Sequence, residues 1–212
     1  MSRKQSSGRS VGAVSMLSLC RRAYFLSEHD LRRIGEAFRL NEISKMNTEI
    51  RRATADDAPA ISEVLRESFL EYRPQYTDEA FAATALSAEG VLRRMAEGPV
   101  WVGLTGGRIT STVSAFIEGG ELWARGMAVL PGTRSQGIGW RLLEQIESYA
   151  RAACCQRMVL STTPFLHRAI SLYERYGFRH SPAGPHEMFG TPLFTMVKSV
   201  GSNVNESSGL SR

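Results

Sequence analysis

The sequence predicts an α/β fold of the α+β kind, with a mixed, mostly antiparallel central sheet and helices on both faces. Strand-like and helical patterns follow one another along residues 48–198 in the order β α α β β β α β α β. Two Gly-Gly pairs, at 106–107 and 119–120, separate strand-like segments and predict tight turns between them. The chain of 212 residues, 42% of them apolar, is large enough for one enzyme-sized core.

The domain is expected to open with a short strand, EIRRAT at 49–54, followed by two helical regions. Thr54 and Asp56 offer N-caps to the first helix. Its apolar face carries Ile61, Val64, Leu65, Phe69 and Leu70. Residues 77–98 form the second helical region, with a break predicted near Gly90.

The second half of the domain alternates strands and helices. Strands are predicted at 100–105, 109–117, 121–130, 157–162 and 193–199. One helix follows Gly137, with an apolar face formed by Ile138, Leu142, Ile146, Tyr149 and Ala153. Another spans 167–176, where Gly177 suits a left-handed C-cap and Phe178 a core position.

The two ends of the chain differ from this pattern. Residues 1–47 predict an extension that is largely disordered or adds one helix, and translation from Met46 is an equally weighted alternative. Residues 199–212 are rich in Gly and Ser and predict a disordered C-terminal tail.

Composition narrows the expected partners and compartment. The net charge is +5, but residues 1–45 hold nine Lys or Arg against four Asp or Glu, so the domain is only mildly basic and suits a phosphate-bearing small molecule. No nucleic acid or membrane partner is expected, and a homodimer is left open. Three cysteines without a disulfide pattern predict a cytoplasmic protein, and the spacing of the four histidines predicts no metal site.

Arg134, Gly137 and Gly139 form an R-x-x-G-x-G sequence between a strand and a helix. A Walker loop would need GxxxxGK[ST], and a dinucleotide fingerprint would need a third glycine where Leu142 stands. The remaining interpretations are an ordinary strand-to-helix turn and an anion site. An anion site would use free backbone N–H groups at the helix N-terminus, with Arg134 as a charged donor.

The string MAVLPGTRSQGIGWRLL, followed by LYERYGF, resembles the GNAT superfamily of acetyl-CoA-dependent N-acetyltransferases over residues 48–198. The resemblance implies the GNAT-like acyl-CoA N-acyltransferase fold. It also implies that acetyl-CoA binds through its pyrophosphate to Arg134, Ser135, Gln136, Gly137, Ile138 and Gly139, and through its pantetheine arm to Met127, Ala128 and Val129. An Asn that many members carry before the last helix is replaced here by Leu166 and His167, so its cofactor contact is not carried over.

The chemistry of acetyl transfer suggests further roles. A lysine-like amine is neutral in only about one molecule in two thousand at pH 7, so its proton must be removed. Glu121 is the favoured base and Glu118 the alternative, because they flank the turn before the strand that precedes the loop. The backbone N–H of Val129 is expected to stabilise the oxyanion. The resemblance implies that Tyr173 protonates the leaving thiolate, and core packing is the competing interpretation.

The predicted function is transfer of an acetyl group to a primary amine of a small molecule by direct attack. Cys154 and Cys155 follow a helix C-terminus, which disfavours a thiolate nucleophile. Acceptor specificity is expected from the region 69–98 and the loop 180–193. The alternatives are a protein N-terminal or lysine acetyltransferase and a non-catalytic acyl-CoA sensor.

Overall fold

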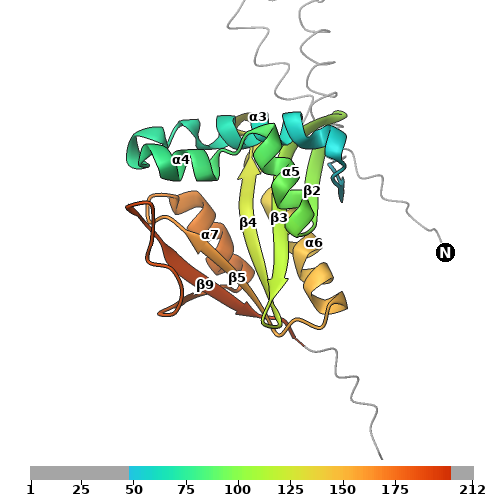
Figure 1. The fold of residues 1–212 in the computed structure, drawn as a ribbon. Helices are drawn as coiled ribbons and strands as arrows, with labels where there is room; N and C mark the ends of the chain where they lie inside the picture. The colour runs from blue at the N-terminus through green and yellow to red at the C-terminus, as the bar shows by residue number, and fades with distance from the viewer. Residues whose placement is uncertain (1–47, 202–212) are drawn as a thin grey trace, which may run out of the picture. The chain divides into compact units, whose positions relative to one another are not determined.

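A computed structural model describes residues 48–201 (Figure 1). Seven strands form one sheet in the order β1-β2-β3-β4-β5-β9-β6, and every neighbouring pair is antiparallel except β4 and β5. The strands are β1 (Glu49–Arg52), β2 (Val100–Thr105), β3 (Arg108–Glu118), β4 (Glu121–Val129), β5 (Arg157–Thr162), β6 (Arg179–Ser181) and β9 (Phe194–Ser199). The predicted mixed, mostly antiparallel sheet is confirmed, including both Gly-Gly hairpins.

Helices cover both faces of the sheet, as expected. They are α3 (Ala58–Leu70), α4 (Asp78–Thr84), α5 (Ala88–Glu97), α6 (Ile138–Ala152) and α7 (His167–Tyr176). One apolar cluster packs α6 and α7 against the sheet through residues such as Leu142 and Phe178. A second packs α3 and α5 on the opposite face, around Ile61 and Val102. No helix within residues 48–201 is long and apolar enough to cross a bilayer.

Several boundaries differ from the prediction. The break in the second helical region lies at 85–87, not near Gly90, because the Ser87 hydroxyl accepts a hydrogen bond from the Gly90 N–H (3.2 Å) and starts α5 there. Thr54 caps a short 3-10 turn, η1 (Ala55–Asp57), as a capping box with Asp57, and Asp57 rather than Asp56 is then the N-cap of α3. A short hairpin, β7 (Glu187–Met188) and β8 (Thr191–Pro192), and the strand β6 had no clear sequence pattern.

The folded chain also continues slightly beyond its predicted C-terminal end. Ser199 belongs to β9, and Val200 is buried and donates its N–H to the Gln156 carbonyl (2.9 Å). The disordered tail predicted at 199–212 therefore cannot include these two residues. The predictions for residues 1–47 and 202–212 lie outside the described part of the chain.

The sheet opens where β4 and β5 separate. Their parallel pairing ends at Ala124 and Leu160, although both strands continue. Between two paired positions on β3 and β4, the strand β3 has one residue and β4 has two, so β4 carries a β-bulge at Gly126. Gly126 takes a left-handed conformation (φ 58°), which bends β4 away from β5. The bend leaves a gap in the sheet that the functional site occupies.

Candidate active site

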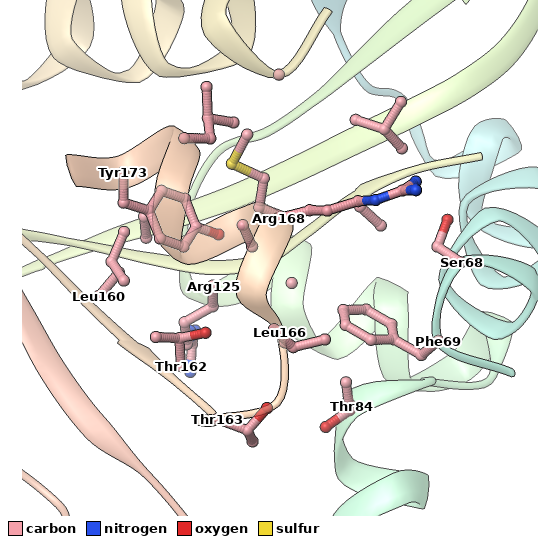
Figure 2. A pocket seen from close by; sticks show the side chains of 18 of the residues that line it. Ser68, Phe69, Thr84, Arg125, Leu160, Thr162, Thr163, Leu166, Arg168 and Tyr173 are labelled. Atoms are coloured by element: carbon pink, nitrogen blue, oxygen red, sulfur yellow. The ribbon is translucent and has the colours of Figure 1, made fainter. Parts of the chain in front are cut away.

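A cavity of about 1200 Å³ lies where β4 and β5 separate (Figure 2). Figure 2 shows Tyr173 and Leu160 on one side of it and Ser68 and Phe69, from α3, on the other. One half is lined by the segments 133–140 and 166–175, and the other by α3, α4, α5 and the loop that contains β7 and β8. Residues 123–129 of β4 and residues 160–163, at the end of β5 and just after it, border both halves. The cavity thus connects the two faces of the sheet.

The loop before α6 presents a row of unused donors to this cavity. Within the described chain, the backbone N–H groups of residues 135–140 have no backbone or side-chain acceptor, and the first hydrogen bond into α6 runs from the Arg141 N–H to Gly137. Ser135 (φ 65°) and Gly137 (φ 76°) both adopt left-handed conformations. Alternating conformations of this kind turn successive N–H groups toward one point and create an anion site.

The two glycines of this loop serve different purposes. Gly137 has open space where a Cβ would stand, so its requirement for glycine comes from the left-handed backbone. At Gly139, a Cβ would lie 2.8 Å from Cδ2 of Leu172 and 3.3 Å from Cε of Met127. Gly139 therefore allows α6 to pack closely on α7 and β4, which aims the helix N-terminus at the cavity.

Arg134 does not point freely into the anion site. Its Nε donates to the Val129 carbonyl (3.1 Å), its Nη2 donates to the Ser68 carbonyl (3.0 Å), and its Nη1 pairs with Glu71. The structure does not support the prediction that this side chain is a free donor to pyrophosphate. Instead, Arg134 ties the loop to the end of α3, so it positions the backbone donors.

The end of β4 offers backbone groups to the gap. Leu130 donates its N–H to the Thr110 carbonyl (2.9 Å), and hydrogen bonding alternates along an antiparallel pair, so the N–H and C=O of Val129 point away from β3. The contact from Arg134 to the Val129 carbonyl agrees with this direction. Met127, Ala128 and Val129 all line the cavity. The backbone groups of this segment that point away from β3, such as the Val129 N–H, can pair with an extended arm as with an additional strand.

Tyr173, on α7, satisfies both interpretations that the sequence left open. It is 7% exposed and packs edge-on against Phe178, with ring centroids 5.9 Å apart, yet it also lines the cavity. No polar atom within residues 48–201 forms a hydrogen bond with its hydroxyl. Burial raises the pKa of Tyr173 well above its ordinary value. The phenol therefore stays protonated and can act as a hydrogen-bond donor.

The structure does not bring Glu121 or Glu118 to this site. The two residues pair across the β3–β4 turn, at the opposite end of β4 from Val129, about 25 Å away along the strand. Glu121 also forms an ion pair with Arg157. Neither glutamate lines the cavity, so the prediction of Glu121 as the general base is wrong on geometric grounds.

The acceptor half of the cavity is built from residues that sequence patterns did not single out. Its walls are aromatic and cationic and contain no Asp or Glu among the described residues. The main contributors are Phe69, Tyr72, Tyr76, Arg94, Phe116, Trp123 and Arg125. The Ser68 and Thr162 hydroxyls are buried here without a partner in the described chain. The sequence predicted that the segments 69–98 and 180–193 contribute to this half, but not which of their residues line it.

The loop 180–193 forms one wall of this half. The Thr77 hydroxyl donates to the Phe189 carbonyl (2.8 Å), and the Thr77 N–H donates to the hydroxyl of Thr191 (3.1 Å). Thr77 is the N-cap of α4, and Thr191 is 2% exposed. These contacts join the β7–β8 hairpin to α4 and restrict access from that side.

Comparison with known proteins identifies the family. Residues 58–178 match the acetyltransferase (GNAT) family. The uncharacterized N-acetyltransferase YjgM of Escherichia coli K12 is 32% identical over 151 residues, which cover 66% of this chain and 87% of that protein. The uncharacterized N-acetyltransferase YhfO of Bacillus subtilis is 28% identical over 148 residues, covering 68% of this chain and 97% of that protein.

Solved structures show the same fold. The PaiA N-acetyltransferase of Thermoplasma acidophilum, in complex with coenzyme A, superposes with a TM-score of 0.63 at 19% identity, over 72% of this chain and 99% of that one. A putative acetyltransferase of Salmonella typhimurium with acetyl-CoA gives a TM-score of 0.58 at 22% identity, over 74% and 95%. Together with the donor loop and the split sheet, these matches show that the chain belongs to the GNAT family and is an acetyl-CoA-dependent acetyltransferase.

Proposed function

We propose that the enzyme transfers the acetyl group of acetyl-CoA to a primary amine of a small molecule by direct attack of the amine on the thioester. The observation that carries this proposal is the acceptor half of the cavity, which the hairpin at 187–192, hydrogen-bonded to Thr77, walls on one side. A small amine fits such a space, whereas a protein chain needs an open groove for the residues that flank its reacting amine.

The groups around the gap support direct transfer. Cys155 is buried, and burial together with Cys154 raises the pKa of its thiol; neither cysteine lines the cavity, so neither supplies an acyl-enzyme nucleophile. The N–H of Val129 is directed to stabilise the oxyanion that forms when the amine attacks. As the tetrahedral intermediate collapses, the Tyr173 hydroxyl donates to the departing thiolate.

Proton removal from the amine is assigned to water rather than to a carboxylate. No Asp or Glu from residues 48–201 lines the cavity, and Tyr76 is a poor base because burial raises the pKa of its phenol. The unpartnered Ser68 and Thr162 hydroxyls can bind a water chain leading out of the site.

Thiol release from acetyl-CoA tests the proposal. The purified enzyme is screened against small primary amines and against ten-residue peptides with free N-termini or lysines, after thermal shift has established acetyl-CoA binding. We expect turnover with at least one small amine and none above background with peptides. Faster turnover of peptides would show a protein acetyltransferase. Tight acetyl-CoA binding without thiol release on any amine would show a sensor.

A further inference from the structure

Arg94, on the inner side of α5, is a half-buried cation without a hydrogen-bond or ion-pair partner among the described residues. It lines the cavity, and within residues 48–201 no carboxylate, carbonyl or hydroxyl accepts a hydrogen bond from its guanidinium. Glu97, one turn along the same helix, is paired with Arg125 instead. The guanidinium therefore keeps free donors that face the cavity and can bind an anion from outside the chain.

The backbone of β4 accommodates this guanidinium directly beside the reaction centre. A Cβ at Gly126 would lie 2.5 Å from Nη1 of Arg94, so the missing side chain of Gly126 lets the cation rest against the β4 bulge. Gly126 immediately precedes the segment 127–129, which borders the gap between the strands. An anion held by Arg94 would therefore lie near the amine that attacks the thioester.

The charges around Arg94 also favour the binding of an anion. Burial, with added repulsion from Arg125, lowers the pKa of Arg94 to about 10, so the side chain is still cationic at neutral pH. The cavity walls supply no compensating carboxylate from the described residues. Arg125 is already bound to Glu97 and stacks on Phe116, with its guanidinium carbon 4.1 Å from the ring centroid.

Arg94 is not placed to bind the phosphates of acetyl-CoA. Arg94 comes from α5, which packs with α3 on one face of the sheet, around Ala128. The donor loop at 135–140 starts α6, which packs on the opposite face. The cation thus belongs to the acceptor half, where the neighbouring walls are the aromatic rings of Phe69, Phe116 and Trp123.

We propose that Arg94 binds a carboxylate of the acceptor, so that the substrate is a small primary amine that also carries a carboxylate and an apolar body, as an α-amino acid with an apolar side chain does. A guanidinium suits this ligand because it donates two parallel hydrogen bonds to a carboxylate. The inference rests on the proposed function and specifies its acceptor.

Pairs of acids and their carboxamides isolate the contribution of the substrate carboxylate to kcat/KM. The enzyme is assayed with L-phenylalanine, L-leucine and L-methionine, and with the carboxamide of each. We expect kcat/KM for at least one acid to exceed that of its carboxamide by about 30-fold or more, because an unpaired buried charge is left when the carboxylate is missing. Binding of the N-acetyl products of both series to the CoA-bound enzyme, measured by calorimetry, reports recognition without turnover.

Two neighbouring arginines provide the variant and its control. Arg94→Met should lower kcat/KM for the acid by about 100-fold while changing that of the carboxamide by less than threefold, and Arg94→Lys should fall between. Arg93→Met makes the same chemical change one residue earlier, where the side chain is exposed and paired with Glu89, and should leave both values unchanged. Unaltered stabilisation by acetyl-CoA confirms that each variant is folded.

The outcomes test the role of Arg94 separately from the proposed function. Equal acetylation of acids and carboxamides, or an unchanged preference in Arg94→Met, would overturn the role of Arg94 and leave the proposed function intact. Failure to acetylate any of these acids, with no binding of their N-acetyl products, would also overturn it. Turnover confined to peptides would overturn the proposed function itself.

Discussion

Replacing Tyr173 by Phe tests the assignment of the thiolate's proton donor. The substitution removes only a hydroxyl that has no hydrogen-bond partner within residues 48–201, and the ring keeps its edge contact with Phe178. Stability should therefore change by less than about 1 kcal/mol, since no protein hydrogen bond is lost. The rate therefore distinguishes a proton donor from a packing residue. A residue that only packs would show neither a loss of stability nor a loss of rate on this substitution.

The expected rate effect follows from the environment of the phenol. A free phenol has a pKa near 10 and a thiol about 8.5, so full proton transfer is uphill by roughly 2 kcal/mol, and burial raises the pKa of Tyr173 further. The hydroxyl must then act as a hydrogen-bond donor that strengthens as charge develops on sulfur. Assistance of this kind is worth about 10²- to 10⁴-fold, and kcat should fall by at least 10².

The assay combines thiol release under saturating acetyl-CoA, calorimetric Kd for acetyl-CoA, and urea unfolding. We expect a loss in kcat, a Kd within about twofold of wild type, and an unchanged unfolding midpoint. Because the phenol stays protonated, a fall in kcat with rising pH below pH 10 must come from another group. Such a fall should therefore be the same in Tyr173→Phe as in the wild type. A kcat within threefold of wild type, with chemistry rate-limiting, would refute the assignment and leave water as the donor.

Three further substitutions test other parts of the structure. Gly137→Asp should weaken acetyl-CoA binding at least tenfold more than Gly137→Ala, because both strain the left-handed backbone but only Asp adds negative charge at the donor loop; equal Kd values would exclude an anion site. Glu71→Gln should weaken acetyl-CoA binding by up to about threefold if Arg134 positions the loop, whereas tighter binding would indicate that freed Arg134 contacts phosphate directly. Glu147→Gln should cost about 3 kcal/mol in urea unfolding at pH 7, since Glu147 accepts hydrogen bonds from Tyr176, Lys198 and Arg151 (each 2.6 Å). Burial alone raises the pKa of Glu147, but these hydrogen bonds outweigh it and hold the pKa below the usual value. The folded pKa is depressed, so this stabilisation is full above the unfolded pKa near 4.3 and is lost as the pH falls through the folded value. A difference in unfolding free energy between the two proteins that stayed constant as the pH was lowered would contradict the charge-based explanation.

Local patterns predicted the mixed sheet and the order of elements along the chain well, because turns and apolar periodicity are short-range properties. The pairs at 106–107 and 119–120 specify hairpins by their left-handed glycines. The opening between β4 and β5 was not predictable from Gly126 alone, because an isolated glycine in a strand marks either a bulge or a close approach. Here it marks both, since the bulge and the approach of Arg94 coincide at that residue.

The site was predictable where it depends on backbone and not where it depends on long-range packing. Gly137 and Gly139 lie at the helix start that their spacing indicated. Glu121 flanks the turn before the strand that leads to the loop, but this extended strand places it at the far end of the sheet from Val129. Arg94 lies within a charged helical segment, and only the tertiary packing of α5 shows which arginine turns inward.

A cavity without carboxylates raises the question of how the acceptor amine loses its proton, and the cationic walls supply an answer. Nearby positive charges disfavour an ammonium and lower its pKa, so Arg94 and Arg125 would increase the neutral, reactive fraction of a bound amine. The same charges would repel an ordinary amine on entry. A carboxylate on the acceptor resolves this conflict, because its attraction to Arg94 offsets the repulsion while the amine still experiences the remaining positive field. We infer that binding and activation of the acceptor depend on the same cation, so Arg94→Met should shift the acidic limb of the kcat profile for the carboxamide, which reports the bound amine, to higher pH even where kcat at high pH is unchanged.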